Sequence, residues 1–123
     1  MATNAINWFD IPVTNMDRAL KFYNTIFGVD MSAIEPMPGF KMAMFPSEEG
    51  VGGAIVQGEG YVPSQKEGSV LYLNGGEDLN TVLNKVEGAG GKVSQAKEGI
   101  GEHGFIAFFT DSEGNKVGLH SMG

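Results

Sequence analysis

Few side chains in this sequence could do chemistry. The chain has two histidines, His103 and His120, and no cysteine, so neither a disulfide nor a thiol nucleophile nor a thiolate metal site can form. A metal site would therefore need imidazole and carboxylate ligands. No Ser-His-Asp spacing and no dinucleotide fingerprint occurs. His103 lies between Glu102 and Gly104, a setting typical of an exposed turn.

Composition indicates a globular protein and excludes several other classes. The chain has 123 residues, enough for a single domain over residues 1–123, with 41% hydrophobic and 19% charged residues. No apolar run approaches a membrane span, and the N-terminal residues do not resemble a signal peptide, so we expect no membrane partner and a cytoplasmic location. A net charge of −7 disfavours nucleic acid as a partner.

Apolar spacing predicts two similar series of elements. Residues 6–13 form a strand with Trp8 and Asp10 on one face, and the helix that follows has a capping box at Thr14 and ends at Gly28. The apolar stripe of that helix comprises Met16, Ala19, Leu20, Tyr23 and Phe27. The further strands are expected at about 29–36, 40–45, 51–57, 70–73, 92–97, 104–110 and 116–121, and a second helix carries the stripe Leu79, Val82, Leu83 and Val86.

The two series repeat each other along the chain. A shift of 63 residues relates the helices, for example Met16 to Leu79, and a shift of 64 relates the acidic turns, for example Glu49 to Glu113. The predicted fold is α+β, with two tandem βαβββ modules. Module one spans about 5–57, a linker about 58–67, and module two about 68–121. Because Glu48–Gly50 and Glu113–Asn115 lead into strands, we interpret them as hairpin turns and not as phosphate loops.

Two stretches carry a resemblance to a known family. Residues 11–23 (IPVTNMDRALKFY) and residues 111–120 (DSEGNKVGLH) resemble the vicinal oxygen chelate superfamily of glyoxalase I, bleomycin-resistance proteins and extradiol dioxygenases. The resemblance implies that the two modules form curved mixed sheets around one cavity, with metal ligands on the first and last strands of each module. It also implies a homodimer.

The positions of the family's metal ligands hold no coordinating side chain in this sequence. The first-strand histidine is replaced by Trp8 and the last-strand glutamate by Gly118, and the internal shifts carry these positions to Leu71 and Ala54. None of these four side chains binds a divalent cation. We therefore predict no metal and no other cofactor.

The resemblance leaves His120 and Asp10 as the polar candidates for the cavity, because they lie on the same strand faces as Gly118 and Trp8. As catalytic residues they would be a base and its orienting carboxylate; the alternative is that both serve only local structure. The expected ligand-binding residues are Trp8, Met44, Val56, Leu71, Gly118 and His120. The predicted function is metal-free binding of a small, partly apolar molecule. The alternative is a lyase, isomerase or dioxygenase-type enzyme that uses His120 and Asp10 or an unrecognised metal site.

Overall fold

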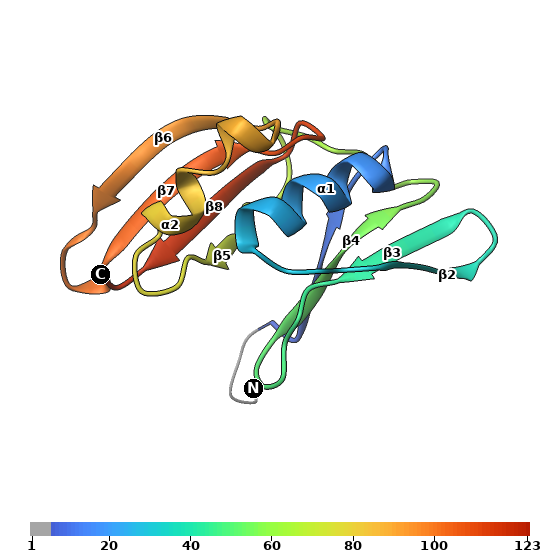
Figure 1. Cartoon of the computed structure of the whole chain (residues 1–123), viewed down its shortest axis with the longest axis horizontal. Coiled ribbons are helices and arrows are strands. Elements are labelled where there is room, and N and C mark those ends of the chain that lie inside the picture. Colours follow the sequence, from blue (N-terminus) through green and yellow to red (C-terminus); the bar gives the residue numbers. More distant parts are fainter. Residues whose placement is uncertain (1–5) are drawn as a thin grey trace.

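The computed structural model describes residues 6–123 and has the predicted α+β fold of two successive βαβββ modules (Figure 1). Module one contains β1 (Trp8–Pro12), α1 (Met16–Phe27), β2 (Ala33–Met37), β3 (Phe40–Met44) and β4 (Gly52–Gln57). Module two contains β5 (Tyr72–Asn74), α2 (Asn80–Leu83), the 3₁₀ turn η1 (Glu87–Ala89), β6 (Lys92–Gly99), the 3₁₀ turn η2 (Gly101–His103), β7 (Phe105–Thr110) and β8 (Lys116–Ser121).

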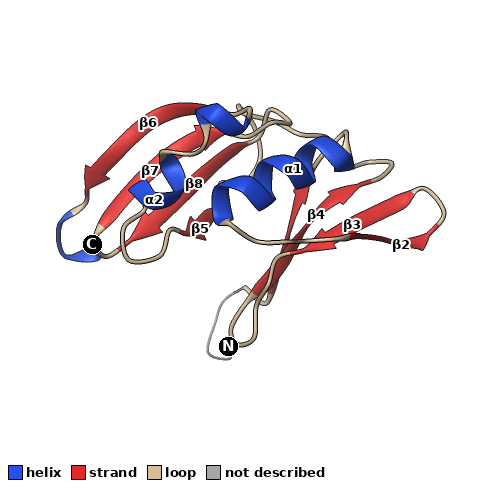
Figure 2. Cartoon of the chain, viewed as in Figure 1, coloured by secondary structure: helices blue, strands red, loops and turns tan. Residues whose placement is uncertain are grey.

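Each module forms its own four-stranded mixed sheet. The strand orders are β1-β4-β3-β2 and β5-β8-β7-β6, so the first strand of each module lies at a sheet edge and pairs in parallel with the last strand. The other neighbours pair antiparallel. Figure 2 shows the strands as two separate groups with α1 between them. Pro12, which cannot donate to a ladder, is the last residue of the edge strand β1, as expected.

The first helix forms where predicted, with a different cap. Asn15, and not Thr14, is the N-cap: its side-chain oxygen accepts a hydrogen bond from the Arg18 backbone N–H at 3.1 Å. The predicted cap at Thr14 is wrong: the Thr14 hydroxyl donates to Glu113 of module two and accepts from Nη2 of Arg18 in place of a backbone N–H group. Gly28 ends the helix in the left-handed conformation (φ 63°), as predicted.

The buried surface of α1 is wider than a single stripe. Phe22 and Ile26 are buried along with Met16, Ala19 and Tyr23, whereas Leu20 and Phe27 are only partly buried. The reason is that α1 packs against both modules: the Phe22 ring lies 5.9 Å from the Phe109 ring of β7. One continuous hydrophobic core therefore includes side chains from both sheets.

The second helix is shorter than its apolar pattern predicts. The stripe Leu79, Val82, Leu83 and Val86 is buried, but α2 has four residues and is followed by the separate turn η1. Its N-cap residue, Leu79, offers no capping side chain, and backbone N–H groups of Lys85 and Val86 bond three residues back, which tightens the chain. No helix within residues 6–123 is long and apolar enough to cross a membrane.

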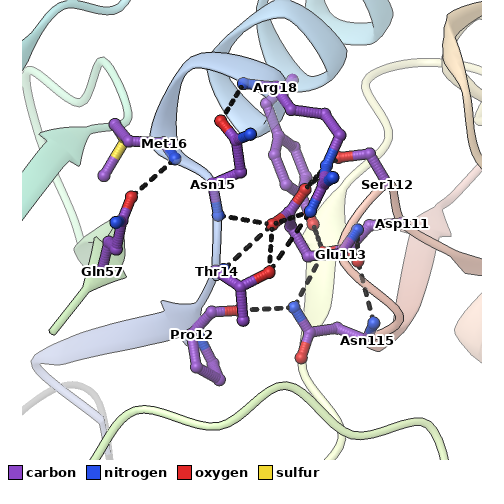
Figure 3. A network of polar contacts seen from close by, with 11 residues as sticks. Pro12, Thr14, Asn15, Met16, Arg18, Gln57, Asp111, Ser112, Glu113 and Asn115 are labelled. Carbon is purple, nitrogen blue, oxygen red and sulfur yellow. Dashed lines mark hydrogen bonds and ion pairs between the residues drawn. The ribbon is translucent and has the colours of Figure 1, made fainter. Parts of the chain in front are cut away.

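A carboxylate from module two holds the start of α1 (Figure 3). Oε1 of Glu113 accepts hydrogen bonds from the backbone N–H groups of Thr14 and Asn15, each at 2.9 Å, and Oε2 accepts one from Nε of Arg18 at 2.6 Å. The Glu113 side chain is inaccessible to solvent, while Arg18 is 52% exposed. Burial by itself would raise the pKa of Glu113, but these donors outweigh it and lower the pKa from 4.5 to about 2.

A second carboxylate of the same turn is buried and fully bonded. Oδ2 of Asp111 accepts from the Tyr23 hydroxyl at 2.7 Å and from Nδ2 of Asn115 at 2.9 Å, and Oδ1 accepts the backbone N–H groups of Glu113 and Asn115. Burial, followed by the nearby Asp111 charge, raises the pKa of Tyr23 well above its ordinary value. Asn115 also donates to the Pro12 carbonyl at 2.7 Å, so the turn joins module two to both β1 and α1.

We expect Glu113→Gln to destabilise the protein mainly by removing the charge at the module junction. The pKa difference would correspond to roughly 3 kcal/mol, but because Arg18 is half exposed we expect a loss of about 1–2 kcal/mol at pH 7. The folded-state pKa is depressed, so this contribution is present above about pH 4.5 and disappears as the pH falls towards 2. The variant and the wild type should therefore converge in acid.

Urea denaturation at pH 7, 4 and 2.5 measures this difference. The matched control is Glu49→Gln, because Glu49 occupies the corresponding turn of module one and is exposed. Its substitution should change the free energy of unfolding by less than about 0.5 kcal/mol. Equal effects of the two substitutions at pH 7 would contradict the role of Glu113.

Candidate functional site

Most of the candidate residues lie on the sheet faces that point away from the hydrophobic core, here called the open faces; Leu71 packs against the core. On the open face of module one, the indole Nε1 of Trp8 donates a hydrogen bond to Oδ1 of Asp10 at 2.9 Å. This contact places the two side chains on one face, as the period of two predicts. Trp8 is 42% exposed, and its ring lies over Gly52, where an added Cβ would come within 3.2 Å.

Module two repeats this arrangement with different residues. Tyr72 pairs with Gly118, and its ring covers that glycine so closely that an added Cβ would lie 2.6 Å from the ring. Asn74 pairs with His120 in the same register. Gly118 therefore provides room for the Tyr72 ring and does not leave an open hollow.

The strand registers correct the residue of module two that was assigned as the counterpart of Trp8. Asp10 pairs with Ala54 in module one, and Tyr72 pairs with Gly118 in module two. Because Ala54 and Gly118 correspond by the shift of the acidic turns, Tyr72 is the counterpart of Asp10. The counterpart of Trp8 is then Val70, so the assignment of Leu71 is wrong by one residue. The cause is an extra residue between first strand and helix in module two, which a shift taken from the helices does not reveal.

Trp8, Asp10 and Leu71 line one cavity of about 380 Å³, here called the Trp8 cavity. It lies beside the edge strand β1 and the linker, and its wall also includes Pro12, Val62, Ser64, Glu67 and Lys116. Leu71 packs in addition against the hydrophobic core. The cavity offers an aromatic wall, aliphatic surface and a few polar groups, which is the usual composition of a small-molecule site.

His120 lines a different cavity. This cavity, of about 730 Å³, is bordered by Tyr72, Asn74, Glu77 and Met122. Nε2 of His120 lies 2.7 Å from the backbone carbonyl oxygen of His103, which can only accept, so Nε2 carries the hydrogen and Nδ1 is the nitrogen left to act as a base. Asp10 is bonded to Trp8 in the other module. The expected pairing of His120 with Asp10 is thus not formed in this structure.

The remaining candidates differ in accessibility. Met44 is 51% exposed and pairs with Ala54 on the open face of module one. Val56 and Ala54 have no exposed surface. The His103 side chain is 79% exposed in η2 and lies 3.7 Å from Glu102. Within residues 6–123, no group of three or more His, Asp or Glu side chains is placed to hold a metal ion.

Sequence reasoning missed Tyr72 and Lys116 on the open face of module two. No local sequence signal shows that the Tyr72 ring lies over Gly118, because this contact depends on the parallel register of β5 and β8. Lys116 begins β8 two residues before Gly118, so period-two alternation already placed it on the same face. The sequence pattern placed Lys116 in the last strand, 116–121, but assigned it no role in a site.

Comparison with known proteins agrees with this fold. The family model described as "Glyoxalase/Bleomycin resistance protein/Dioxygenase superfamily" matches residues 5–119. "Putative glyoxylase CFP32" of Mycobacterium bovis is 32% identical over 120 residues, which cover 92% of this chain and 44% of that protein. This chain thus spans less than half the length of that relative.

A second relative matches along most of its length. A "Glyoxylase-like domain-containing protein" of Didymella fabae is 33% identical over 117 residues, covering 89% of this chain and 88% of that protein. Among solved structures, TnmS3, an antibiotic binding protein from a Streptomyces species, has a TM-score of 0.66 and 21% identity, covering 100% of this chain and 99% of that chain. The match over residues 5–119 and the identity to the Didymella fabae protein show that the chain belongs to the Glyoxalase/Bleomycin resistance protein/Dioxygenase superfamily.

Proposed function

We propose that the chain binds a small, partly apolar molecule in the Trp8 cavity and that it does so without a metal ion. The single observation that carries this proposal is the Trp8 ring. It is 42% exposed, it lines a cavity, and its hydrogen bond to Asp10 fixes its orientation. A fixed aromatic plane binds a flat ligand with little loss of side-chain entropy. The similarity in fold to an antibiotic binding protein is consistent with this use.

The chemistry of the wall supports metal-free binding. The corrected ligand positions hold Trp8, Ala54, Val70 and Gly118, and none of these side chains coordinates a cation. The residues present therefore do not fit the metal centre that the resemblance implies. The polar groups of the cavity, Asp10 and Ser64 among them, would orient the ligand by hydrogen bonds.

Ligand binding can be detected directly, because Trp8 is the only tryptophan of the chain. Planar apolar compounds, natural-product antibiotics among them, are screened by thermal shift. A ligand at 100 times its Kd should stabilise the fold by roughly 2.7 kcal/mol. Hits should also change the tryptophan fluorescence, and Trp8→Ala should weaken their binding at least about tenfold.

The matched control for this experiment is Met37→Ala, because Met37 is 57% exposed on β2 and does not line the Trp8 cavity. Its substitution should leave the affinity unchanged. Ligands that bind Trp8→Ala and wild type equally would contradict the site. About one tightly bound zinc, nickel, iron or manganese ion per chain, in protein purified without a histidine tag, would contradict metal-free binding.

The second candidate function is an enzyme of lyase, isomerase or dioxygenase type, and the similarity to a protein named as a glyoxylase favours it. His120 would be the base through Nδ1, without help from Asp10, which lines the Trp8 cavity and is bonded to Trp8. If the chain converts an α-oxoaldehyde–thiol adduct, His120→Gln should lower kcat/KM by about 10²-fold or more. His103→Gln is the control, because its exposed side chain makes no contact with His120 and its backbone carbonyl is retained. Equal rates in the two variants would exclude His120 as the base.

We further infer a homodimer in which a second copy covers part of the open faces. The surface available for this contact lies on module one, where the large apolar side chains Ile34 and Met44 are exposed and no other role is proposed for them. Light scattering at micromolar concentration should give twice the chain mass of 13.1 kDa. Met44→Glu should shift this value towards the monomer, while Val62→Glu in the linker, where Val62 is 77% exposed, should not. A monomeric wild type would refute the inference.

A further inference from the structure

A second, polar pocket lies on the open face of module two, away from the Trp8 side chain. It has a volume of about 280 Å³ and is lined by Gln65, Ser94, Gln95, Phe108, Thr110 and Lys116, and is here called the Lys116 pocket. This wall contains one cation and no acidic residue. In a chain with 15 acidic and 8 basic residues, such a wall is a local exception to the charge of the molecule.

Lys116 is held by an aromatic ring. Its ammonium nitrogen lies 4.6 Å from the centroid of the Phe108 ring, which is a cation–π contact. Among the ion pairs within residues 6–123, Arg18 joins Glu113, Lys97 joins Asp78 and His103 lies near Glu102, so Lys116 belongs to none of them. The Lys116 charge is therefore positioned but not neutralised by a carboxylate.

Lys97 is an internal comparison for this arrangement. Its ammonium nitrogen lies 4.5 Å from the centroid of the Phe105 ring, almost as in the Lys116 contact, but it also lies 2.9 Å from Oδ1 of Asp78. The two lysines thus share the ring contact and differ in the carboxylate partner. Of these two lysines, Lys116 is the one without a carboxylate partner among the ion pairs of residues 6–123.

The surrounding groups suit a planar monoanion. The hydroxyl groups of Ser94 and Thr110 can donate hydrogen bonds to an oxyanion next to Lys116, while one amide hydrogen of Gln95 is already given to Glu98 at 2.8 Å. One lysine balances one negative charge, whereas a phosphate dianion would leave excess charge in a chain of net −7. Beside the pocket, the Tyr72 ring meets the Phe108 ring edge-on at 5.5 Å and is 51% exposed, so it offers a flat surface.

We propose that the Lys116 pocket binds the carboxylate of a small aromatic acid, with the ring of the acid against Tyr72. The pocket is close in size to the lower end of small-molecule sites, about 300–1,000 Å³. Lys116 also lines the Trp8 cavity, so one ligand could reach both cavities, but the carboxylate site does not depend on the function proposed for Trp8.

Isothermal titration calorimetry of the full chain with benzoate, at pH 7 and low salt, tests this site. Benzamide is the neutral analogue of the same shape. Benzoate should bind saturably and benzamide at least about tenfold more weakly, because a charge-assisted hydrogen bond is lost. Lys116→Met should weaken benzoate binding about tenfold or more, Lys116→Arg should largely retain it, and Lys97→Met should leave it unchanged.

The outcomes separate this site from the Trp8 cavity. Trp8→Phe should keep benzoate binding, whereas ligands of the Trp8 cavity should lose affinity. If Trp8→Phe abolishes benzoate binding, the carboxylate occupies the Trp8 cavity and the Lys116 pocket is refuted. No saturable benzoate binding, equal binding of benzamide, or equal losses in Lys116→Met and Lys97→Met would also refute it. None of these results would by itself refute the function proposed for Trp8.

Discussion

The structure depends on two carboxylates in one turn of module two, Asp111 and Glu113. A buried carboxylate is costly unless donors satisfy it, and both of these are satisfied mainly by groups of α1, its N-terminal approach or the turn itself. Since the donors and acceptors belong to different modules, the two sheets cannot change their relative position without breaking these bonds. The Trp8 cavity, which has residues of both modules in its wall, therefore depends on this turn for its geometry.

The repeat is symmetric in its chain path but not in its chemistry. Glu49, the counterpart of Glu113, is exposed, and α2 is a short helix whose N-cap residue, Leu79, has no capping side chain. The open faces differ in the same way. Module one presents an indole bonded to a carboxylate, while module two presents Tyr72, His120 and a lysine over a ring. The two modules thus share a chain path but present different side chains on their open faces.

Asp10 and His120, the candidate acid–base residues, lie in different modules. Asp10 is engaged by Trp8 and His120 by a backbone carbonyl, each within its own module and each beside its own cavity. The four positions that correspond to the family's metal ligands, Trp8, Ala54, Val70 and Gly118, hold apolar side chains or glycine. These two facts favour recognition by shape and by single polar groups over a chelating centre.

The amino-acid pattern alone determined the fold, because alternation and helical spacing act locally: the strand near residues 40–44, the helix ending at Gly28 and the hairpin turn at Gly114 lie where predicted. The face shared by Trp8 and Asp10 follows from the same period. Long-range contacts decided the rest. Asn15 replaced Thr14 as the cap because Glu113, 99 residues away from Thr14, took the Thr14 hydroxyl.

The arrangement of the candidate site also depends on contacts between residues far apart in the sequence. The parallel pairing with β8 sets the register of β5 and makes Tyr72 the counterpart of Asp10. This is one residue before the position that the helix shift of 63 gives. The carboxylate-free wall around Lys116 combines residues of the linker, β6, β7 and β8, which are adjacent only after the sheet has formed. Local sequence sets which face a side chain takes, but pairing between distant strands decides which side chains meet, and that pairing exists only in the folded chain.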